Sequence, residues 1–231
     1  MLQIDAIDVA YGPAQVLHGL SLEARSGEVL CVMGRNGAGK STLLKAIVGL
    51  VPVRAGRTTL DGAPLSGQPA HAIARQGVGY VPQGRRLFGD LSVAENLEIG
   101  LMARRRGARA RDHVLSLFPR LRDRLGQVAR TLSGGEQQML AIARALCLEP
   151  KVLLMDEPAE GLQPSIVALI ADTVRDLKAT GVATILVEQR VDTALKVADR
   201  VAFMVGGRIA EVADAARLGP GAPQFLKYVG V

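Results

Sequence analysis

Residues 34–42 constrain this chain more than any other stretch. They read GRNGAGKST and contain the G-x-x-x-x-G-K-S pattern of a phosphate-binding loop, or P-loop. A short apolar run, 29–33, precedes the loop, and apolar residues at near-helical spacing follow it over 41–48. The pattern requires this order of buried strand, loop and helix. We therefore predict an α/β protein that binds a nucleotide through its phosphates.

Each residue type in the loop has a physical role. Glycine lets the backbone curl and bring N–H groups close to anionic oxygens, and the start of the next helix favours phosphate. Lys40 is expected to reach the β- and γ-phosphates, and the Ser41 hydroxyl to bind Mg²⁺. The alternative, an ordinary glycine-rich turn, does not explain the flanking strand and helix. The predicted phosphate-binding residues are Gly34, Arg35, Asn36, Gly37, Ala38, Gly39, Lys40, Ser41 and Thr42.

Two later apolar strands end in polar residues. The run 152–155 leads into Asp156 and Glu157, and the run 184–187 leads into Glu188 and Gln189. In α/β proteins, ligands bind beyond the carboxyl ends of the strands. Asp156 is therefore predicted to hold Mg²⁺, and Glu157 to position or deprotonate a water. Acids with a purely structural role are also common at strand ends.

Short strands are predicted before the P-loop. The stretch 2–9 alternates apolar and polar residues with a slip of phase near Ala6, which allows a bulge. The stretches 16–22 and 28–33 also suggest strands, and together the three predict an antiparallel sheet. Tyr11 lies in the turn after the first strand, where an exposed aromatic residue is the simple interpretation.

Composition limits the class of protein. The 231 residues are 48% hydrophobic, carry a net charge of +6 and include Cys31 and Cys147 within apolar runs. These values favour a globular protein with reduced core thiols in the cytoplasm. Uninterrupted apolar runs fall well short of the ~20 residues of a membrane helix.

One segment is rich in arginine and could face nucleic acid or anionic lipid. We favour a solvated helix face, because aromatic residues are not interleaved with the arginines as nucleic-acid binding would require. The residues of this segment are Arg104, Arg105, Arg106, Arg109, Arg111, Arg120, Arg122, Arg124 and Arg130.

The stretch LSGGEQQ at 132–138 precedes an apolar helical run. Ser133 and Glu136 match a capping box, in which each side chain bonds the backbone of the other. The bland interpretation is a helix start and nothing more. Two glycines at a helix N-terminus also form a second anion-binding position, separate from the P-loop.

These motifs together resemble ABC-type ATPases. The P-loop, Gln83 after a strand, LSGGEQQ and the strand ending in Asp156 and Glu157 have the order and spacing of that family over essentially the whole chain. The resemblance implies a single ABC ATPase domain. It would contain a RecA-like core and an N-terminal antiparallel β subdomain (about 1–87 and 150–231), with a helical subdomain inserted at about 88–149.

The resemblance also implies residue roles. Tyr11 would stack on adenine, Gln83 would sense Mg²⁺ and the attacking water, and Glu157 would be the general base. Gln189 occupies the usual position of a switch histidine, and Gln163 that of an aspartate in the loop after the base. The helix start would touch the γ-phosphate bound to a second ATPase subunit, through Ser133, Gly134, Gly135 and Glu136.

Four stretches resemble the ATP-binding subunits of branched-chain amino acid importers: 80–85, 87–88, 91–97 and 186–189. The stretch 160–166 also resembles the ATP-binding subunits of the related urea importers. The implied protein is an energy-coupling ATPase on the cytoplasmic face of the membrane. It would use ATP and Mg²⁺ and pair with a second ATPase subunit, with membrane permease subunits and, indirectly, with a substrate-binding protein. Nucleic acid is not expected. The alternatives are a soluble ABC ATPase acting on nucleic acid or ribosomes, and a small-molecule kinase.

Overall fold

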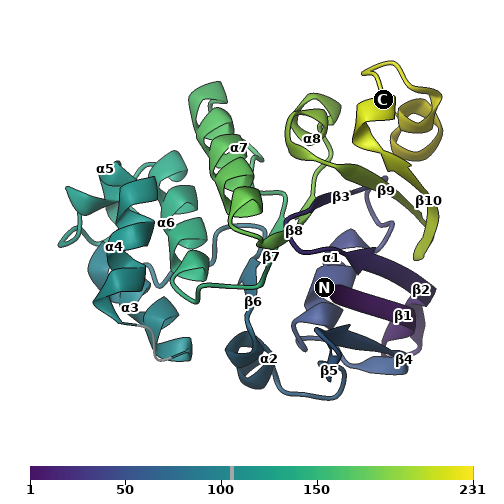
Figure 1. Ribbon diagram of the computed structural model, residues 1–231, viewed down its shortest axis with the longest axis horizontal. Helices are drawn as coiled ribbons and strands as arrows, with labels where there is room; N and C mark the ends of the chain where they lie inside the picture. The colour runs from purple at the N-terminus through teal and green to yellow at the C-terminus, as the bar shows by residue number, and fades with distance from the viewer. Residues whose placement is uncertain (105–106, 231) are drawn as a thin grey trace.

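A six-stranded sheet lies at the centre of this computed structural model, which describes residues 1–104 and 107–230. Its strand order is β10-β9-β3-β8-β7-β6; the inner pairs are parallel, and β10 is antiparallel to β9. All parallel strands therefore end at one edge of the sheet (Figure 1). The strands are β3 (Val29–Met33), β6 (Val78–Val81), β7 (Val152–Asp156), β8 (Ala183–Val187), β9 (Arg200–Val205) and β10 (Arg208–Asp214).

The central strand β3 is buried on both faces. Val29, Cys31 and Met33 belong to one hydrophobic core, and Leu30 and Val32 belong to the other. This explains why the sequence shows a continuous apolar run there instead of an alternating one. The prediction that β3 joins the N-terminal antiparallel sheet is wrong, because covering both faces requires the middle of the parallel sheet.

The antiparallel sheet has the order β2-β1-β4-β5. The predicted bulge in its first strand is confirmed, because the register shifts between Ile4 and Ile7, and Ala6 has a φ of 47°. The Ala6 N–H donates to the Ser21 hydroxyl at 2.9 Å, which satisfies a donor that the bulge takes out of the ladder. The strands are β1 (Leu2–Tyr11), β2 (Ala14–Ala24), β4 (Val53–Leu60) and β5 (Ala63–Pro64).

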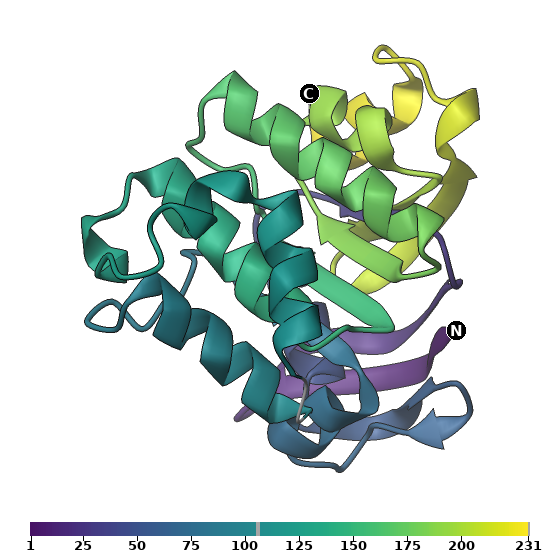
Figure 2. The ribbon, with the colours of Figure 1, turned by 60° about the vertical axis from the view of Figure 1, so that its left-hand side comes forward.

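Six of the helices form two groups beside the sheets, while α1 lies between the two sheets and contacts β7 and β2 (Figure 1). In Figures 1 and 2, α3–α6 gather on the side of β6, away from β1, β2 and β4, while α7 and α8 cover the central sheet. This arrangement agrees with an α/β protein of the P-loop ABC type; the exact division into subdomains stays a prediction. The helices are α1 (Lys40–Ile47), α2 (Ala70–Gln76), α3 (Val93–Ala103), α4 (Ala108–Leu117), α5 (Pro119–Arg122), α6 (Gly134–Leu146), α7 (Pro164–Ala179) and α8 (Val191–Val197), with short helical turns at Ala129–Thr131, Ala215–Arg217 and Phe225–Val229.

Two expectations, buried free thiols and the absence of a membrane helix, can be compared with this fold. Cys31 and Cys147 are both buried and free. Within residues 1–104 and 107–230, none of the helices combines the length and the apolar content that a bilayer span needs. In the arginine-rich segment, Arg105 and Arg106 lie outside the described residues.

One ion pair ties the two sheets together. Arg200, at the start of β9, bonds both carboxylate oxygens of Glu28 at 2.5 and 3.0 Å and also donates to the Glu23 carbonyl in β2 at 3.0 Å. The Arg200 side chain is 16% exposed and that of Glu28 is 9% exposed. The neighbouring carboxylate of Glu28 raises the pKa of Arg200.

Replacing Arg200 by methionine should lower the free energy of unfolding by about 3 kcal/mol, because it leaves the Glu28 carboxylate buried without its cation. Urea denaturation measures this change. Arg57→Met is the matched control, since its pair with Asp5 is largely exposed, at 75% and 51%, and should contribute less than about 1 kcal/mol. Equal losses in the two variants would contradict the account.

Candidate functional site

The P-loop connects β3 to α1 and has no room for side chains at two of its glycines. A Cβ on Gly34 would lie 2.3 Å from the Met204 carbonyl oxygen. Gly39 has a φ of 107°, and a Cβ there would lie 2.8 Å from the Met204 side chain and 2.9 Å from that of Leu17. Glycine is therefore required at both positions, because the loop packs directly against β9 and β2.

Lys40 is the first residue of α1 and is 5% exposed. Its ammonium group donates to the carbonyl oxygens of Gly34, at 2.7 Å, and Arg35, at 3.1 Å. Burial lowers the pKa of Lys40, while the nearby charges of Glu157 and Asp156 oppose that shift. A buried cation held by two neutral carbonyls can turn to the anionic oxygens of a phosphate placed in the loop.

Ser41 and Asp156 meet at the carboxyl end of the sheet. The Ser41 hydroxyl donates to a carboxylate oxygen of Asp156 at 3.1 Å, and Asp156 is 2% exposed. Burial raises the pKa of Asp156, and the hydrogen bond from Ser41 partly offsets this effect. A hydroxyl and a carboxylate are the hard oxygen donors that Mg²⁺ prefers, so these two residues fit the ion.

Glu157 follows β7 with a φ of 48°, a left-handed conformation that is uncommon for a residue with a side chain. Its N–H donates to the Val187 carbonyl of β8 at 3.0 Å, which anchors the turn. One carboxylate oxygen accepts a hydrogen bond from the Gln189 amide at 2.5 Å, and the other accepts from Gln83 at 3.3 Å. Each oxygen of the Glu157 carboxylate therefore accepts a hydrogen bond from a different side-chain amide.

Most of these residues line one cavity of about 450 Å³, which extends from the P-loop to the ends of β7 and β8. Gly34 and Asp156 are not in the lining, but they accept hydrogen bonds from Lys40 and Ser41, which are. Two members of the lining are not among the predicted site residues: Val16, and Glu160, whose carboxylate accepts from Gln83 at 3.0 Å. The local signals for Glu160 are its position three residues after Glu157 and its place at the start of the stretch 160–166. The lining consists of Val16, Asn36, Gly37, Ala38, Gly39, Lys40, Ser41, Thr42, Gln83, Glu157, Glu160 and Gln189.

The second predicted anion position lies at the start of α6. The Ser133 hydroxyl accepts from the Glu136 N–H at 3.4 Å, and a Glu136 carboxylate oxygen accepts from the Ser133 N–H at 2.9 Å, which confirms the capping box. Ser133 lowers the pKa of Glu136, and Arg124 pairs with the other Glu136 oxygen at 3.0 Å. Ser133 is exposed, while Gly134 and Gly135 are partly buried against the side chains of Arg85 and Ile166.

Besides Gly34 and Asp156, three groups of predicted residues are not part of the P-loop cavity. Tyr11 is 45% exposed at the end of β1, and Gln163 is exposed at the N-cap of α7. The start of α6 with Ser133, Gly134 and Gly135, here called the Ser133 tip, is outside the lining. Arg35 lines a neighbouring cavity of about 340 Å³ with Tyr228. The roles of these residues toward a nucleotide stay predictions.

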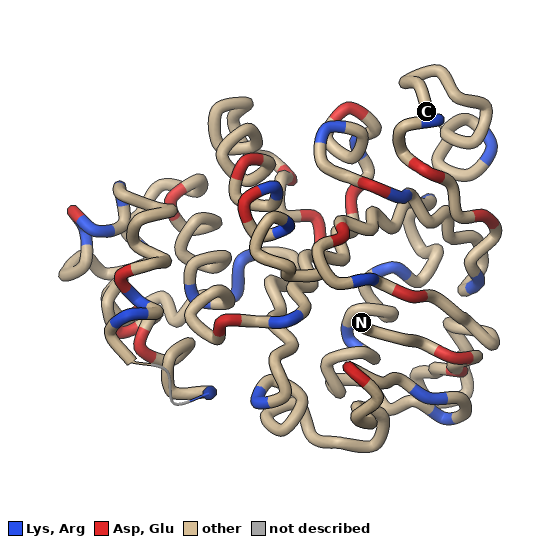
Figure 3. The backbone as a smooth tube through the Cα atoms, viewed as in Figure 1, with Lys and Arg blue, Asp and Glu red and all other residues tan. Residues whose placement is uncertain are grey.

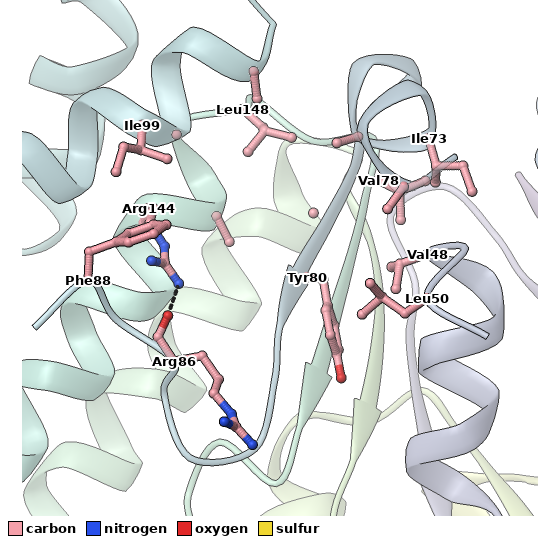
Figure 4. A pocket seen from close by; sticks show the side chains of 16 residues that line it. Val48, Leu50, Ile73, Val78, Tyr80, Arg86, Phe88, Ile99, Arg144 and Leu148 are labelled. Atoms are coloured by element: carbon pink, nitrogen blue, oxygen red, sulfur yellow. Dashed lines mark hydrogen bonds between the residues drawn. The ribbon is translucent and has the colours of Figure 1, made fainter. Parts of the chain in front are cut away.

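A separate apolar groove of about 350 Å³ opens between α2 and β6 on one side and α3 and α6 on the other (Figure 4). Leu50 and Phe88 in its lining are 57% and 49% exposed. Arg144 of α6 lines the groove beside Phe88, where its guanidinium lies 5.3 Å from the centre of the Phe88 ring and donates to the Arg86 carbonyl at 2.8 Å (Figure 4). The lining residues come from five separate segments, so no local sequence pattern indicates the groove.

Comparison with known proteins agrees with this geometry. The family model described as ABC transporter matches residues 17–160. The chain is 45% identical over 211 residues to the high-affinity branched-chain amino acid transport ATP-binding protein BraG of Pseudomonas aeruginosa, covering 90% of this chain and 91% of that protein. It is 38% identical to the probable branched-chain amino acid transport ATP-binding protein LivF of Archaeoglobus fulgidus, covering 91% and 90%.

Solved structures resemble it closely as well. One described as an ATP-binding subunit of an ABC transporter superposes with a TM-score of 0.84 at 28% identity, covering 93% of this chain and 90% of the other. The resemblance inferred from the P-loop, LSGGEQQ and the acidic strand end is thereby confirmed. The chain belongs to the ABC transporter family, as one of its ATP-binding proteins.

Proposed function

We propose that this chain is the ATP-hydrolysing subunit of an ABC importer for branched-chain amino acids. The names of BraG and LivF support the substrate class. The observation that carries the chemistry is the Glu157 carboxylate, held by Gln189 and Gln83 at the edge of the P-loop cavity.

In this proposal the P-loop binds the phosphates of ATP through its backbone N–H groups and through Lys40. The ammonium group of Lys40 leaves the carbonyls of Gly34 and Arg35 and stabilises charge on the transferred phosphoryl group. The Glu157 carboxylate accepts a proton from the attacking water, whose direction of attack the amides of Gln83 and Gln189 help to set. Positioning and electrostatics carry the reaction, and no covalent enzyme intermediate is needed.

Ser41 and Asp156 would hold Mg²⁺, with Gln83 as a further oxygen donor. When bound, the ion neutralises part of the charge on the phosphate oxygens. The buried Asp156 carboxylate, whose pKa is raised by desolvation, gains a cation in this arrangement.

A second ATPase subunit would complete the site. The exposed Ser133 tip and the positive end of α6 have no place in the chain's own P-loop cavity. They would instead contact the γ-phosphate of ATP bound to a partner, which is either a second copy or a related chain. ATP binding would then hold the two subunits together, and ATP hydrolysis would allow them to separate.

The apolar groove supports docking of a membrane permease subunit. Its exposed Leu50 and Phe88 suit an apolar helical element, and Phe88 lies on the same segment as Gln83. Binding there would place the chain at the cytoplasmic face of the membrane. It would also connect the permease to the segment that contacts Glu157.

Two other functions receive less support. A urea importer is suggested by the stretch 160–166, which contributes Glu160 to the cavity. Action on nucleic acid would use the arginine-rich segment. However, Arg124 and Arg130 in that segment pair with Glu136 and Asp90, and Figure 3 shows acidic residues interspersed with the basic ones on that side of the molecule.

Replacing Glu157 by glutamine should lower kcat for ATP hydrolysis at least about hundredfold, because the general base is lost, while ATP still binds. Phosphate release and nucleotide binding measure the two effects. Glu160→Gln is the matched control, since this acid also accepts from Gln83, and it should keep turnover within a few fold. If Glu160→Gln abolished turnover and Glu157→Gln did not, the base would be misassigned.

Replacing Phe88 by aspartate should prevent permease subunits from co-purifying, because it puts a charge into the apolar groove. ATP binding by the isolated chain should not change. Leu226→Asp is the control, since Leu226 is 70% exposed near the carboxyl terminus and outside the groove. Normal co-purification of the Phe88 variant would rule out this groove as the docking site.

The reconstituted transporter should take up labelled leucine in an ATP-dependent manner, because the chain is 45% and 38% identical to BraG and LivF, with 90% and 91% of its length covered. Uptake into proteoliposomes measures this directly, with the Glu157→Gln chain as the inactive control. Uptake of labelled urea without leucine would instead support the urea importer.

A further inference from the structure

Glu188 is buried beside the catalytic residues, yet the mechanism above gives it no role. It follows β8 directly and is 4% exposed. Among the described residues its Oε2 atom has no hydrogen-bond partner. Burial raises the pKa of Glu188. An acid is a costly residue in such a place unless it makes contacts that an apolar side chain cannot make.

The contacts of its other oxygen supply that reason. Glu188 Oε1 accepts hydrogen bonds from the N–H groups of Gln189, at 2.9 Å, and Arg190, at 3.1 Å. Both N–H groups lie in the turn between β8 and α8, outside the strand ladder. The Arg190 guanidinium instead bonds Asp192 at 3.0 Å, so this residue contacts Glu188 through its backbone. A single carboxylate oxygen therefore fixes the backbone of two consecutive residues.

Fixing that backbone also directs the Gln189 side chain. Its amide donates to Glu157 Oε1 at 2.5 Å, and the Glu157 N–H bonds the Val187 carbonyl one residue before Glu188. The Glu188 N–H bonds the Val32 carbonyl at 3.4 Å, close to the P-loop. Glu188 is thus linked, through the backbone and side chain of Gln189, to the Glu157 carboxylate, which is proposed to activate water.

We propose that Glu188 is a positioning residue for hydrolysis: it holds the backbone of Gln189 so that the Gln189 amide orients the Glu157 carboxylate. The inference rests on the proposed ATPase function of this site. It assigns Glu188 an acceptor role, which the side-chain oxygen of glutamine can also fill.

A double-substitution cycle tests this route. Glu188→Met keeps the length of the side chain and suits a small cavity lined by Leu186, Val167 and Ile170, but it removes the acceptor. It should lower kcat about tenfold or more, because small misplacements of catalytic groups are costly, while the affinity for ATP stays unchanged. Glu188→Gln, which keeps an acceptor, should stay within about twofold of the unaltered chain.

The decisive comparison uses Gln189→Ala. This change alone should lower kcat by a factor similar to that of Glu188→Met, and adding Glu188→Met should produce no further loss, because both act on the same step. Thr193→Val is the matched control. Thr193 lines the same cavity and has a buried hydroxyl without a partner among the described residues, so kcat should not change.

Several results would overturn the proposal: fully multiplicative losses in the double variant, an unchanged kcat in Gln189→Ala, or a loss in Glu188→Gln as large as in Glu188→Met. Glu188→Ala replaces Glu188→Met if the latter does not fold, as judged by its thermal unfolding midpoint. If the unaltered chain hydrolyses no ATP, the proposed function itself fails. If the unaltered chain hydrolyses ATP but the two losses in kcat multiply in the double variant, only the proposed role of Glu188 is wrong.

Discussion

The parallel arrangement of β3, β8 and β7 is the constraint on which the site depends. Parallel strands end at the same edge of a sheet, so residues more than a hundred positions apart meet there. Lys40 and Ser41 follow β3, Asp156 and Glu157 end β7, and Gln189 follows β8. The partly buried hydrogen bond from Ser41 to Asp156 is a direct consequence of this order.

The same edge explains which features could be predicted from sequence. A P-loop and two apolar strands ending in acids are local patterns, and the parallel sheet brings them together without further information. The bulge at Ala6 was visible as a slip in alternation, and it is confirmed by the local φ of 47°. The capping box at Ser133 and Glu136 was equally local, because its two partners lie within one helical turn.

Features that depend on long-range packing could not be predicted in this way. An isolated apolar run does not reveal which sheet it joins, so the sequence suggests the antiparallel sheet for β3, whereas the structure places it in the parallel sheet. Glu160 enters the site only because Gln83 reaches it from another segment. The apolar groove has no local pattern at all. The predicted contacts of Tyr11 and Ser133 involve adenine and a partner's phosphate, so the folded chain alone leaves them as predictions.

Helix α6 connects the two ends of the proposed mechanism. The Ser133 tip lies at its start, and Arg144 near its other end lines the apolar groove. The segment after Gln83 is tied to this helix twice, through the bond from Arg85 to Gln137 at 3.1 Å and through that from Arg144 to the Arg86 carbonyl. A partner seated in the groove would thus contact elements that reach both the chain's own ATP and that of its neighbour.

The central claim is that each ATP is bound by the P-loop of one subunit and by the Ser133 tip of another. The most direct measurement is the structure of the Glu157→Gln complex as it purifies, loaded with ATP and Mg²⁺. The account predicts that the γ-phosphate on this chain's P-loop lies within hydrogen-bond distance of the partner's helix tip, and that Ser133 reaches the partner's ATP. If the Ser133 tip faced solvent while ATP filled the P-loop, the account would be contradicted.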